Sequence, residues 1–292
     1  MSRFARKIQK LLFREQWSLL ICDDTGKILR RLAPPLDRMW ADPFVVRHDG
    51  KTYVFIEQQL TGKNGTLGFL ELQEDLSPSD FKEILAADSH LSFPNVFPVH
   101  TGDKTVWYMI PESNERGSID LYRATSFPDR WVFDSTLISG VNAVDSAVFF
   151  HNDIWYLFTS IEADGHGFNN ALSVFHSDTF PSSNWKRHPL NPVCTGSGNS
   201  RMAGALYRDP MTGFIIRPAQ SCTREYGEYT VLNRVTELSP ETYREERVSE
   251  IRPEGELHAV CTHTFNRCGS LIVRDIKTRI FRFALWNTKK QR

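Results

Sequence analysis

The stretch Trp40-Ala-Asp-Pro-Phe-Val-Val46 decides the fold of this 292-residue chain, because it recurs along the sequence. A tight turn at His48-Asp-Gly50 follows it, and then a second apolar segment, Thr52-Tyr-Val-Phe-Ile-Glu57. The same order of segment, turn and segment begins again, at intervals of about 50–60 residues, with Phe93-Pro-Asn-Val-Phe97, Val144-Asp-Ser-Ala-Val-Phe149, Arg201-Met-Ala-Gly-Ala-Leu-Tyr207 and a shortened His263-Thr-Phe265. Such a period indicates a fold built from repeated units.

Each unit predicts a β-hairpin, because its turn is rich in Asp, Asn or Gly and its second strand in aromatic and β-branched residues. The segments between units, such as Gly65–Leu72, alternate apolar and polar residues as half-buried strands do. Four strands in each of five units predict an all-β fold, a five-bladed β-propeller over residues 16–292. The first strand of each blade lines the central channel, so we expect these polar residues to meet there: Asp42, Asn95, Asp145, Arg201 and His263.

The first 15 residues are predicted to form a short, basic N-terminal helix. Phe4, Ile8, Leu11 and Leu12 fall at helical spacing among five basic residues. Such a helix either packs on the domain beside it or makes a weak contact with an anionic membrane surface. This segment lacks the apolar run of a secretory signal. The five cysteines are odd in number and form no CxxC pair, so reduced thiols in a cytoplasmic protein are predicted.

Charge and motifs exclude several classes of function. The 35 Lys and Arg residues balance 35 Asp and Glu residues, whereas a nucleic-acid-binding protein carries a basic surplus. The sequence contains no P-loop, no dinucleotide-binding glycine motif, no nucleophile elbow and no zinc-protease motif. We therefore predict no nucleic-acid partner, no cofactor and no metal.

Two of the units resemble known carbohydrate-active propellers. Trp-Ala-Asp-Pro-Phe with the following His-Asp-Gly-Lys-Thr-Tyr resembles the first blade, and Val-Asp-Ser-Ala-Val-Phe with Trp-Tyr-Leu-Phe-Thr resembles the third blade, of the glycoside hydrolase clan of families 43, 32 and 68. That clan includes arabinanases, β-xylosidases, invertases and levansucrases. Its first-blade Asp is the base or nucleophile, and its third-blade Asp tunes pKa and holds sugar hydroxyls. The resemblance implies these roles for Asp42 and Asp145.

A second resemblance is more specific. Residues 38–276 resemble the propeller domain at the N-terminus of plant glucosamine inositolphosphorylceramide transferases, which also occurs in bacterial proteins. The matching stretches are His90–Pro94, Tyr108–Ser113, Leu121–Arg123, Phe127–Trp131, His188–Pro192, Arg217–Gln220, Tyr226–Gly227, Leu232–Leu238 and His263–Asn266. In the plant proteins a separate glycosyltransferase domain follows, which implies a glycosyltransferase as a partner.

The fourth unit departs from the hydrolase pattern. The clan takes its general acid, a Glu, from the fourth blade, but Ser200-Arg-Met-Ala-Gly204 holds no carboxylate. Arg201 cannot donate a proton at neutral pH, since an arginine pKa exceeds about 12. The acid is therefore sought at Glu57 and Glu112, which end equivalent strands of blades one and two. A structural role is the alternative for these two and for Asp42 and Asp145.

The remaining candidates would bind substrate. The planar guanidinium groups of Arg201 and Arg217 suit an anionic sugar, a phosphosugar or a nucleotide-sugar diphosphate, or else form structural ion pairs with Asp42 or Asp145. Gln220 and His263 offer hydrogen bonds to sugar hydroxyls, as does Asn95. Trp40 either stacks on a sugar or belongs to the core.

Three hypotheses follow from the sequence. The chain is a carbohydrate-active enzyme that cleaves or transfers glycosidic bonds in the channel, in glycan or glycolipid biosynthesis. Alternatively, it is a non-catalytic glycan-binding propeller beside a separate glycosyltransferase. The third hypothesis is a protein-interaction propeller, which predicts an apolar or charged outer face in place of a polar, acidic channel.

Overall fold

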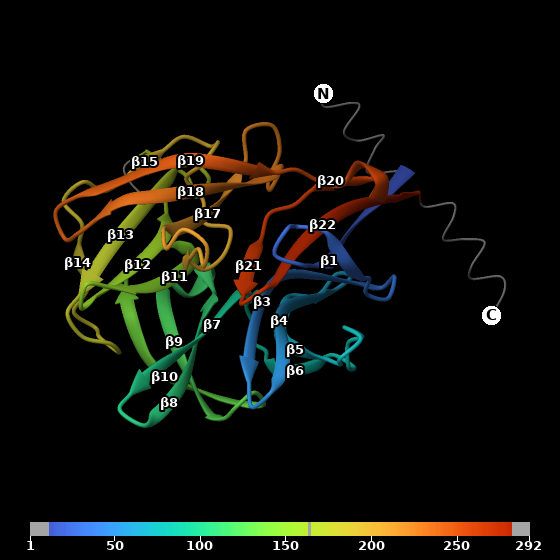
Figure 1. The fold of residues 1–292 in the computed structure, drawn as a ribbon, viewed down its shortest axis with the longest axis horizontal. Coiled ribbons are helices and arrows are strands. Elements are labelled where there is room, and N and C mark those ends of the chain that lie inside the picture. The colour runs from blue at the N-terminus through green and yellow to red at the C-terminus, as the bar shows by residue number, and fades with distance from the viewer. Residues whose placement is uncertain (1–11, 163–164, 282–292) are drawn as a thin grey trace.

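Five antiparallel sheets are arranged around a central axis in the computed structural model, which describes residues 12–162 and 165–281 (Figure 1). The predicted five-bladed propeller is thereby confirmed. Blade 1 consists of β3 (Arg38–His48), β4 (Lys51–Leu60), β5 (Gly65–Leu72) and β6 (Lys82–Leu85). Blade 2 consists of β7 (Ser92–Thr101), β8 (Lys104–Glu112), β9 (Ser118–Ser126) and β10 (Arg130–Ser139).

Blades 3 and 4 are less regular than the first two. Blade 3 contains β11 (Ala143–His151), β12 (Ile154–Ile161), β13 (Ala171–Ser177), β14 (Lys186–Arg187) and the short β15 (Cys194–Thr195). Blade 4 contains β16 (Tyr207–Arg208), β17 (Ile215–Ser221), β18 (Tyr229–Leu238) and β19 (Tyr243–Ile251). Its inner strand is reduced to β16 and an isolated bridge between Met202 and Ala219.

The last blade joins the two ends of the described chain. It contains β20 (Ala259–Cys261), β21 (Phe265–Cys268) and β22 (Leu271–Phe281) together with β1 (Phe13–Cys22) and β2 (Ile28–Leu32). The β1 and β22 strands pair antiparallel along their whole length, from Phe13 with Phe281 to Cys22 with Ile272. This ladder closes the ring, and it places both ends of the described chain in blade 5 (Figure 1).

The N-terminal prediction needs correction at its boundary. The predicted helix covers residues 1–15, but β1 begins at Phe13, because this segment supplies a strand to blade 5. Residues 1–11 of that prediction lie outside the described residues. Within the described part of the chain, the named helical elements are two single 3₁₀ turns, η1 (Asn114–Arg116) and η2 (Gly255–Leu257), and no helix is long and apolar enough to span a bilayer.

The core lies between neighbouring blades, and strand alternation explains why. Successive side chains of a strand point to opposite faces of its sheet. In β4, Phe55 packs in the cluster shared with blade 2, whereas Val54 and Ile56 pack in the cluster shared with blade 5. Both faces of the strand are buried, which produces its continuous apolar run. Each large apolar side chain buried in this way contributes about 1.5–3 kcal/mol.

The inner strands of blades 1 to 3 carry the same backbone irregularity. The pairing register shifts between Ala41 and Phe44, between Ser92 and Asn95, and between Val144 and Ala147. At each bulge one residue has a left-handed φ: Asp42 (50°), Phe93 (45°) and Asp145 (51°). Such strained conformations gather at functional sites. The bulges mark where the strands reach the channel.

Candidate functional site

A cavity of about 280 Å³ opens where the inner ends of the blades meet, and it is acidic. Its walls include four carboxylate residues from three blades: Asp42, Glu57, Glu112 and Asp145. All four predicted catalytic candidates therefore lie in one cavity. Arg201 and His263, two of the predicted binding residues, line it as well. Whether any of them acts on a substrate stays a prediction.

The bulges position two of these carboxylates and tie the blades together. The backbone N–H of Asp42 donates to Asp275 Oδ2 of blade 5 (3.1 Å), and that of Phe93 donates to Asp42 Oδ2 (3.2 Å). The N–H of Asp145 donates to Glu112 Oε2 (3.1 Å) in the same way. The carboxylates of Asp275, Asp42 and Glu112 thus each accept a hydrogen bond from a backbone N–H that a bulge has removed from its strand pairing.

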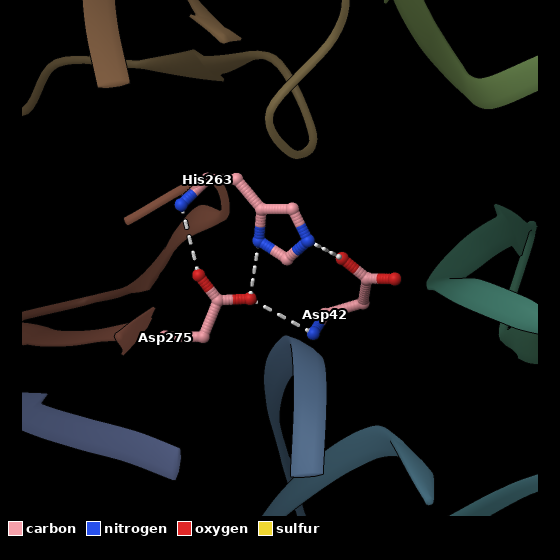
Figure 2. A group of neighbouring side chains, drawn as sticks. All are labelled: Asp42, His263 and Asp275. Carbon is pink, nitrogen blue, oxygen red and sulfur yellow. Dashed lines mark hydrogen bonds and ion pairs between the residues drawn. The ribbon is translucent and has the colours of Figure 1, made fainter. Parts of the chain in front are cut away.

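His263 lies between two buried carboxylates (Figure 2). Its Nδ1 is 2.7 Å from Asp275 Oδ2, and its Nε2 is 3.5 Å from Asp42 Oδ1. Burial lowers the pKa of His263, but Asp275 and Asp42 together outweigh burial and raise this pKa to about 9. The ring is therefore an imidazolium at neutral pH. The ligand atoms of the three residues also lie close enough together to hold a metal ion.

Asp275 is the fixed anion of this group. Its Oδ1 accepts hydrogen bonds from the backbone N–H groups of His263 and Thr264, both at 3.0 Å. Burial raises the pKa of Asp275. The charge and hydrogen bonds of His263 lower this pKa by more than burial raises it, so it lies below its usual value. Trp17 stacks on the imidazole at 4.1 Å between ring centroids. This support fixes the orientation of His263 toward the cavity.

Two cavity carboxyls have raised pKa values. Burial raises the pKa of Asp42 to about 7, with His263 opposing the rise and Glu57 adding to it. Burial also raises the pKa of Glu112 well above its usual range, and Asp145 adds to that rise. Both carboxyls therefore keep their protons to a higher pH than an exposed carboxyl does.

Arg201 forms part of the cavity wall on the side of blade 4. Its Nε donates to Asp145 Oδ2 (2.6 Å), and its Nη2 lies 3.8 Å from Glu112 Oε2. The ring of Tyr226 packs 4.9 Å from its guanidinium carbon. Asp145 and Glu112 raise the pKa of Arg201 further, although burial lowers it, so the side chain is a permanent cation. Among the residues the structure describes, blade 4 contributes no carboxylate to the cavity lining.

Four predicted binding residues lie outside the cavity lining. Gln220 supports it from behind, since its Nε2 donates to Asp145 Oδ2 (2.9 Å). Trp40 packs in the core between blades 5 and 1 and donates from Nε1 to Gln58. Asn95 comes directly after the bulge of β7 in blade 2, and in that bulge Phe93 takes the position that Asp42 has in blade 1. The Nδ2 of Asn95 donates to the backbone carbonyl of Ser146 in blade 3.

Arg217 is the fourth of these residues. It is fully buried inside blade 4, where its Nε and Nη2 donate to the two carboxylate oxygens of Glu245 at 2.7 and 2.6 Å. Sequence reasoning expected an ion pair with Asp42 or Asp145 as the alternative to substrate binding. The actual partner lies on β19 of the same blade.

With this geometry established, the chain can be compared with known proteins. The family model described as "Glucosamine inositolphosphorylceramide transferase 1, N-terminal" matches residues 33–266. The chain belongs to this family. The rice (Oryza sativa subsp. japonica) protein named glucosamine inositolphosphorylceramide transferase 1 is 30% identical over 211 residues, which cover 70% of this chain and 27% of that protein. The Arabidopsis thaliana protein of the same name is 32% identical over 220 residues, covering 71% and 27%.

Solved structures share the fold of this family member. The catalytic domain of a family 62 α-L-arabinofuranosidase from Coprinopsis cinerea superposes with a TM-score of 0.63 at 15% identity, covering 89% of this chain and 85% of that one. A family 117 glycoside hydrolase from Zobellia galactanivorans gives a TM-score of 0.56 at 12% identity, covering 92% and 91%. An α-L-arabinanase from Cellvibrio cellulosa, complexed with arabinohexaose, gives 0.51 at 12% identity, covering 71% and 77%. At these identities the likeness shows the fold.

Several site residues of this family member were not found from the sequence. The predicted site residues do not include Trp17, Asp275 or His90. Trp17 and Asp275 reach the site through the closure of blade 5, which joins residues from opposite ends of the chain. One signal was available, since Asp275 interrupts the apolar strand Leu271-Ile-Val-Arg-Asp-Ile276, and a buried charge needs a partner.

Proposed function

We propose that the cavity is a sugar site at which glycosidic bonds are cleaved or transferred. The observation that carries the proposal is the convergence of Asp42, Glu57, Glu112 and Asp145, from three blades, on one cavity. Its volume of about 280 Å³ lies near the lower end of the range for small-molecule sites, which suits one sugar ring. The fold of solved glycoside hydrolases and the glycosyltransferase name of the sequence relatives support a carbohydrate ligand.

The two carboxyls with raised pKa values divide the work. Chemistry at a glycosidic bond needs one protonated and one ionised carboxyl, and environments that push their pKa values apart assign the roles. The raised pKa of Glu112 suits it to give a proton to the leaving oxygen as the C–O bond breaks. The ionised form of Asp42, which the positive charge of His263 stabilises, either takes a proton from the attacking water or acceptor hydroxyl, or bonds to the anomeric carbon itself.

Arg201 then has a positioning role. It cannot serve as the acid of blade 4, but together with Gln220 it holds Asp145 at the cavity wall. There the carboxylate of Asp145 would accept hydrogen bonds from sugar hydroxyls. A nucleotide-sugar donor, whose leaving group needs little protonation, suits a site without the fourth-blade acid.

A second candidate is a glycan-binding propeller that works beside a glycosyltransferase. The absence of the fourth-blade acid favours this candidate as well, because Arg201 takes the place that a catalytic Glu has in the hydrolase pattern. The chain also spans only 27% of the length of the transferases to which it is similar, so the activity in their name belongs to much longer proteins. In this case the cavity would recognise the sugar on which a partner enzyme acts, on the cytoplasmic side.

The test is a titration of the protein with sugars and nucleotide sugars, followed by thermal unfolding, with Asp42→Asn as the site variant. A ligand bound by the folded state alone raises its stability. Asp103→Asn, in an exposed turn of blade 2, makes the same chemical change outside the cavity. A nucleotide-sugar effect that Asp42→Asn abolishes supports transfer, whereas binding of free glycans without turnover supports the binding propeller. If no sugar stabilises the protein, the proposal is wrong.

A further inference from the structure

The side of the propeller opposite the cavity carries a group of cations. The inner strands of blades 1 to 3 run from a bulge at the cavity to a hairpin turn at their other end. In β3, Arg47 lies five positions after Asp42, a rise of roughly 15 Å along the strand. The hairpin turns of the inner strands therefore lie away from the cavity, on the other side of the molecule.

Equivalent positions of the five inner strands bring these cations together. The second strand pair counted from each hairpin turn contributes one inner-strand residue from each blade. In blade 4 the pair nearest the turn is Asp209 with Phe214. The residues at the equivalent position are Arg47, His100, Phe150, Arg208 and Arg267. The three arginines belong to the consecutive blades 4, 5 and 1, and we call them the arginine cluster.

Two members of the arginine cluster meet at one turn. Nη1 of Arg47, from blade 1, is 3.7 Å from the point that a Cβ on Gly269 of blade 5 would occupy. Nε of Arg267, from blade 5, donates to the carbonyl of the same Gly269 at 2.8 Å. Both guanidinium groups therefore reach the turn at Gly269, which has no side chain to separate them.

Arg208 extends the arginine cluster toward blade 3. Its Nη2 lies 2.8 Å from Nδ1 of His151, and its guanidinium carbon is 5.8 Å from the centre of the Phe149 ring. Burial, and then the charge of Arg208, lower the pKa of His151, so the imidazole is neutral and accepts the hydrogen bond. These two neighbours orient Arg208 without compensating its charge.

The arginine cluster lacks a counter-charge. Among the residues that the structure describes, none of its three members forms an ion pair with an Asp or a Glu. Arginines on the outer half of the blades do form such pairs, as Arg123 does with Asp134 and Arg244 with Glu237. Positive charges gathered in this way attract an anion to the surface that they share.

The acidic residues of the same turns do not supply the counter-charge. Asp49 Oδ2 lies 3.4 Å from His48 Nε2. Burial raises the pKa of Asp209, but hydrogen bonds within its own turn and, less strongly, the charge of Arg267 lower it below its usual value. Its Oδ1 accepts from two backbone N–H groups of that turn. The other two aspartates of these turns are exposed: Asp103 and Asp153.

We propose that the arginine cluster binds a phosphate group. A guanidinium presents a planar fork of N–H donors that matches pairs of phosphate oxygens. A phosphate monoester brings a charge of about −1.5 to −2 at pH 7, so it offsets more of the positive charge than one carboxylate does. The phosphate belongs either to a soluble molecule or to a lipid headgroup, since both present the same oxygens. The inference is independent of the proposed sugar site.

The experiment follows thermal unfolding of the protein with inorganic phosphate and with pyrophosphate. Ionic strength is held constant with chloride, which serves as the reference anion. A ligand that binds only the folded state raises its stability. We expect saturable stabilisation by both phosphates, and we expect Asp42→Asn to show the same stabilisation because its cavity lies on the other side.

Arg47→Gln and Arg267→Gln are the test variants, because each removes one charge from the arginine cluster. We expect each to weaken phosphate binding at least about tenfold, the effect of one lost charged hydrogen bond. Arg130→Gln, at an exposed position of the outer strand β10, makes the same change elsewhere and should respond as the native protein does. Unfolding curves without phosphate establish that the variants fold.

A second measurement separates the two sources of phosphate. The protein is sedimented with phosphatidylcholine vesicles that contain or lack phosphatidic acid. Sedimentation that requires phosphatidic acid and is lost in Arg47→Gln assigns a lipid headgroup to the arginine cluster. Stabilisation by soluble phosphate without sedimentation assigns a soluble ligand. Either result supports the phosphate site.

Three results would overturn the inference. The first is an equal effect of phosphate and chloride, or equal stabilisation of the native protein and the two test variants. The second is a phosphate effect lost in Asp42→Asn and kept in Arg47→Gln, which would place the phosphate in the cavity and leave the proposed function intact. The third is tighter binding of a hexaglutamate peptide than of phosphate, which would make the arginine cluster a docking surface for an acidic protein.

Discussion

Arg201 and Arg217 are both buried arginines of blade 4, yet their surroundings give them different tasks. Arg217 is bound on two nitrogens by Glu245 within its own blade, away from the cavity. Arg201 reaches across to Asp145 of blade 3 and forms part of the cavity wall. The comparison teaches that a buried ion pair within a blade serves stability, whereas an ion pair between blades at the channel can also serve a ligand. The predictions below test this division.

Removing Arg217 should have the largest effect. Arg217→Met leaves Glu245 as a buried charge without its partner, and we expect the free energy of unfolding to fall by about 3–5 kcal/mol. Denaturant unfolding measures the loss. Combining it with Glu245→Leu should recover most of the stability, since an apolar pair replaces the ion pair. If Arg217→Met alone were as stable as the native protein, the structural role of Arg217 would be refuted.

The pH dependence of stability should have opposite signs in the two regions. The folded pKa of Asp42 is about 7 against an ordinary 3.8, so the folded state holds extra protons between these values and loses stability as pH rises from about 4 to 7. The contribution of His263 is complete below pH 6.5 and is lost as pH rises through about 9. Over these windows we expect a change on the order of a few kcal/mol.

Glu245 behaves in the opposite way. Burial raises the pKa of Glu245. The charge of Arg217 and the hydrogen bonds to the carboxylate lower this pKa by more, so it lies below its ordinary value. Its contribution is therefore present above its unfolded pKa and is lost as pH falls through the folded one. Unfolding curves across pH for the native protein and Asp42→Asn separate the regions. The variant should lose the decline between about pH 4 and 7, and an unaltered profile would count against the raised pKa of Asp42.

Removing Arg201 should lower the free energy of unfolding less than removing Arg217 does, but it should impair sugar binding more. In Arg201→Met, Asp145 keeps Gln220 and faces a cavity that admits water, so we expect a loss of about 1–3 kcal/mol. Sugar binding should become undetectable, because the wall that positions Asp145 is gone. Calorimetric titration of the folded variant measures this. Retained affinity would place the ligand elsewhere.

Tyr226 should show the smallest effect. The residue is 40% exposed at the cavity, and its ring lies near Arg201 and edge-on to His263 at 5.3 Å between ring centroids. We expect Tyr226→Ala to weaken sugar binding by up to about tenfold through loss of an aromatic contact, and Tyr226→Phe to retain most of it. Phe133→Ala, at an exposed ring of β10, is the control without effect. If Tyr226→Phe weakens binding as much as the alanine variant, the hydroxyl and not the ring face makes the contact.

The sequence predicted the blade count because each hairpin repeats a local pattern of turn and apolar strand. It also predicted that Asp42, Asp145, Arg201 and His263 converge, because symmetry brings equivalent strand ends together. It failed at Asn95, since the bulge that makes Phe93 the equivalent of Asp42 depends on a left-handed φ with no local sequence signal. The partner of Arg217 was also missed, because the pairing of β17 with β18 and of β18 with β19 sets it.

The ladder that closes the ring has a mechanical consequence. Phe13 and Phe281 are directly paired at one end of the antiparallel β1–β22 ladder. A force that pulls these two residues apart therefore acts across the strands and loads the hydrogen bonds one pair at a time, as a zipper opens. The ring resists such a load far less than a load along the strands, where all ten pairs between Phe13 and Cys22 would share it. Traction on both ends of the described chain would thus open blade 5 first and carry Trp17 of β1 away from His263, on which it stacks.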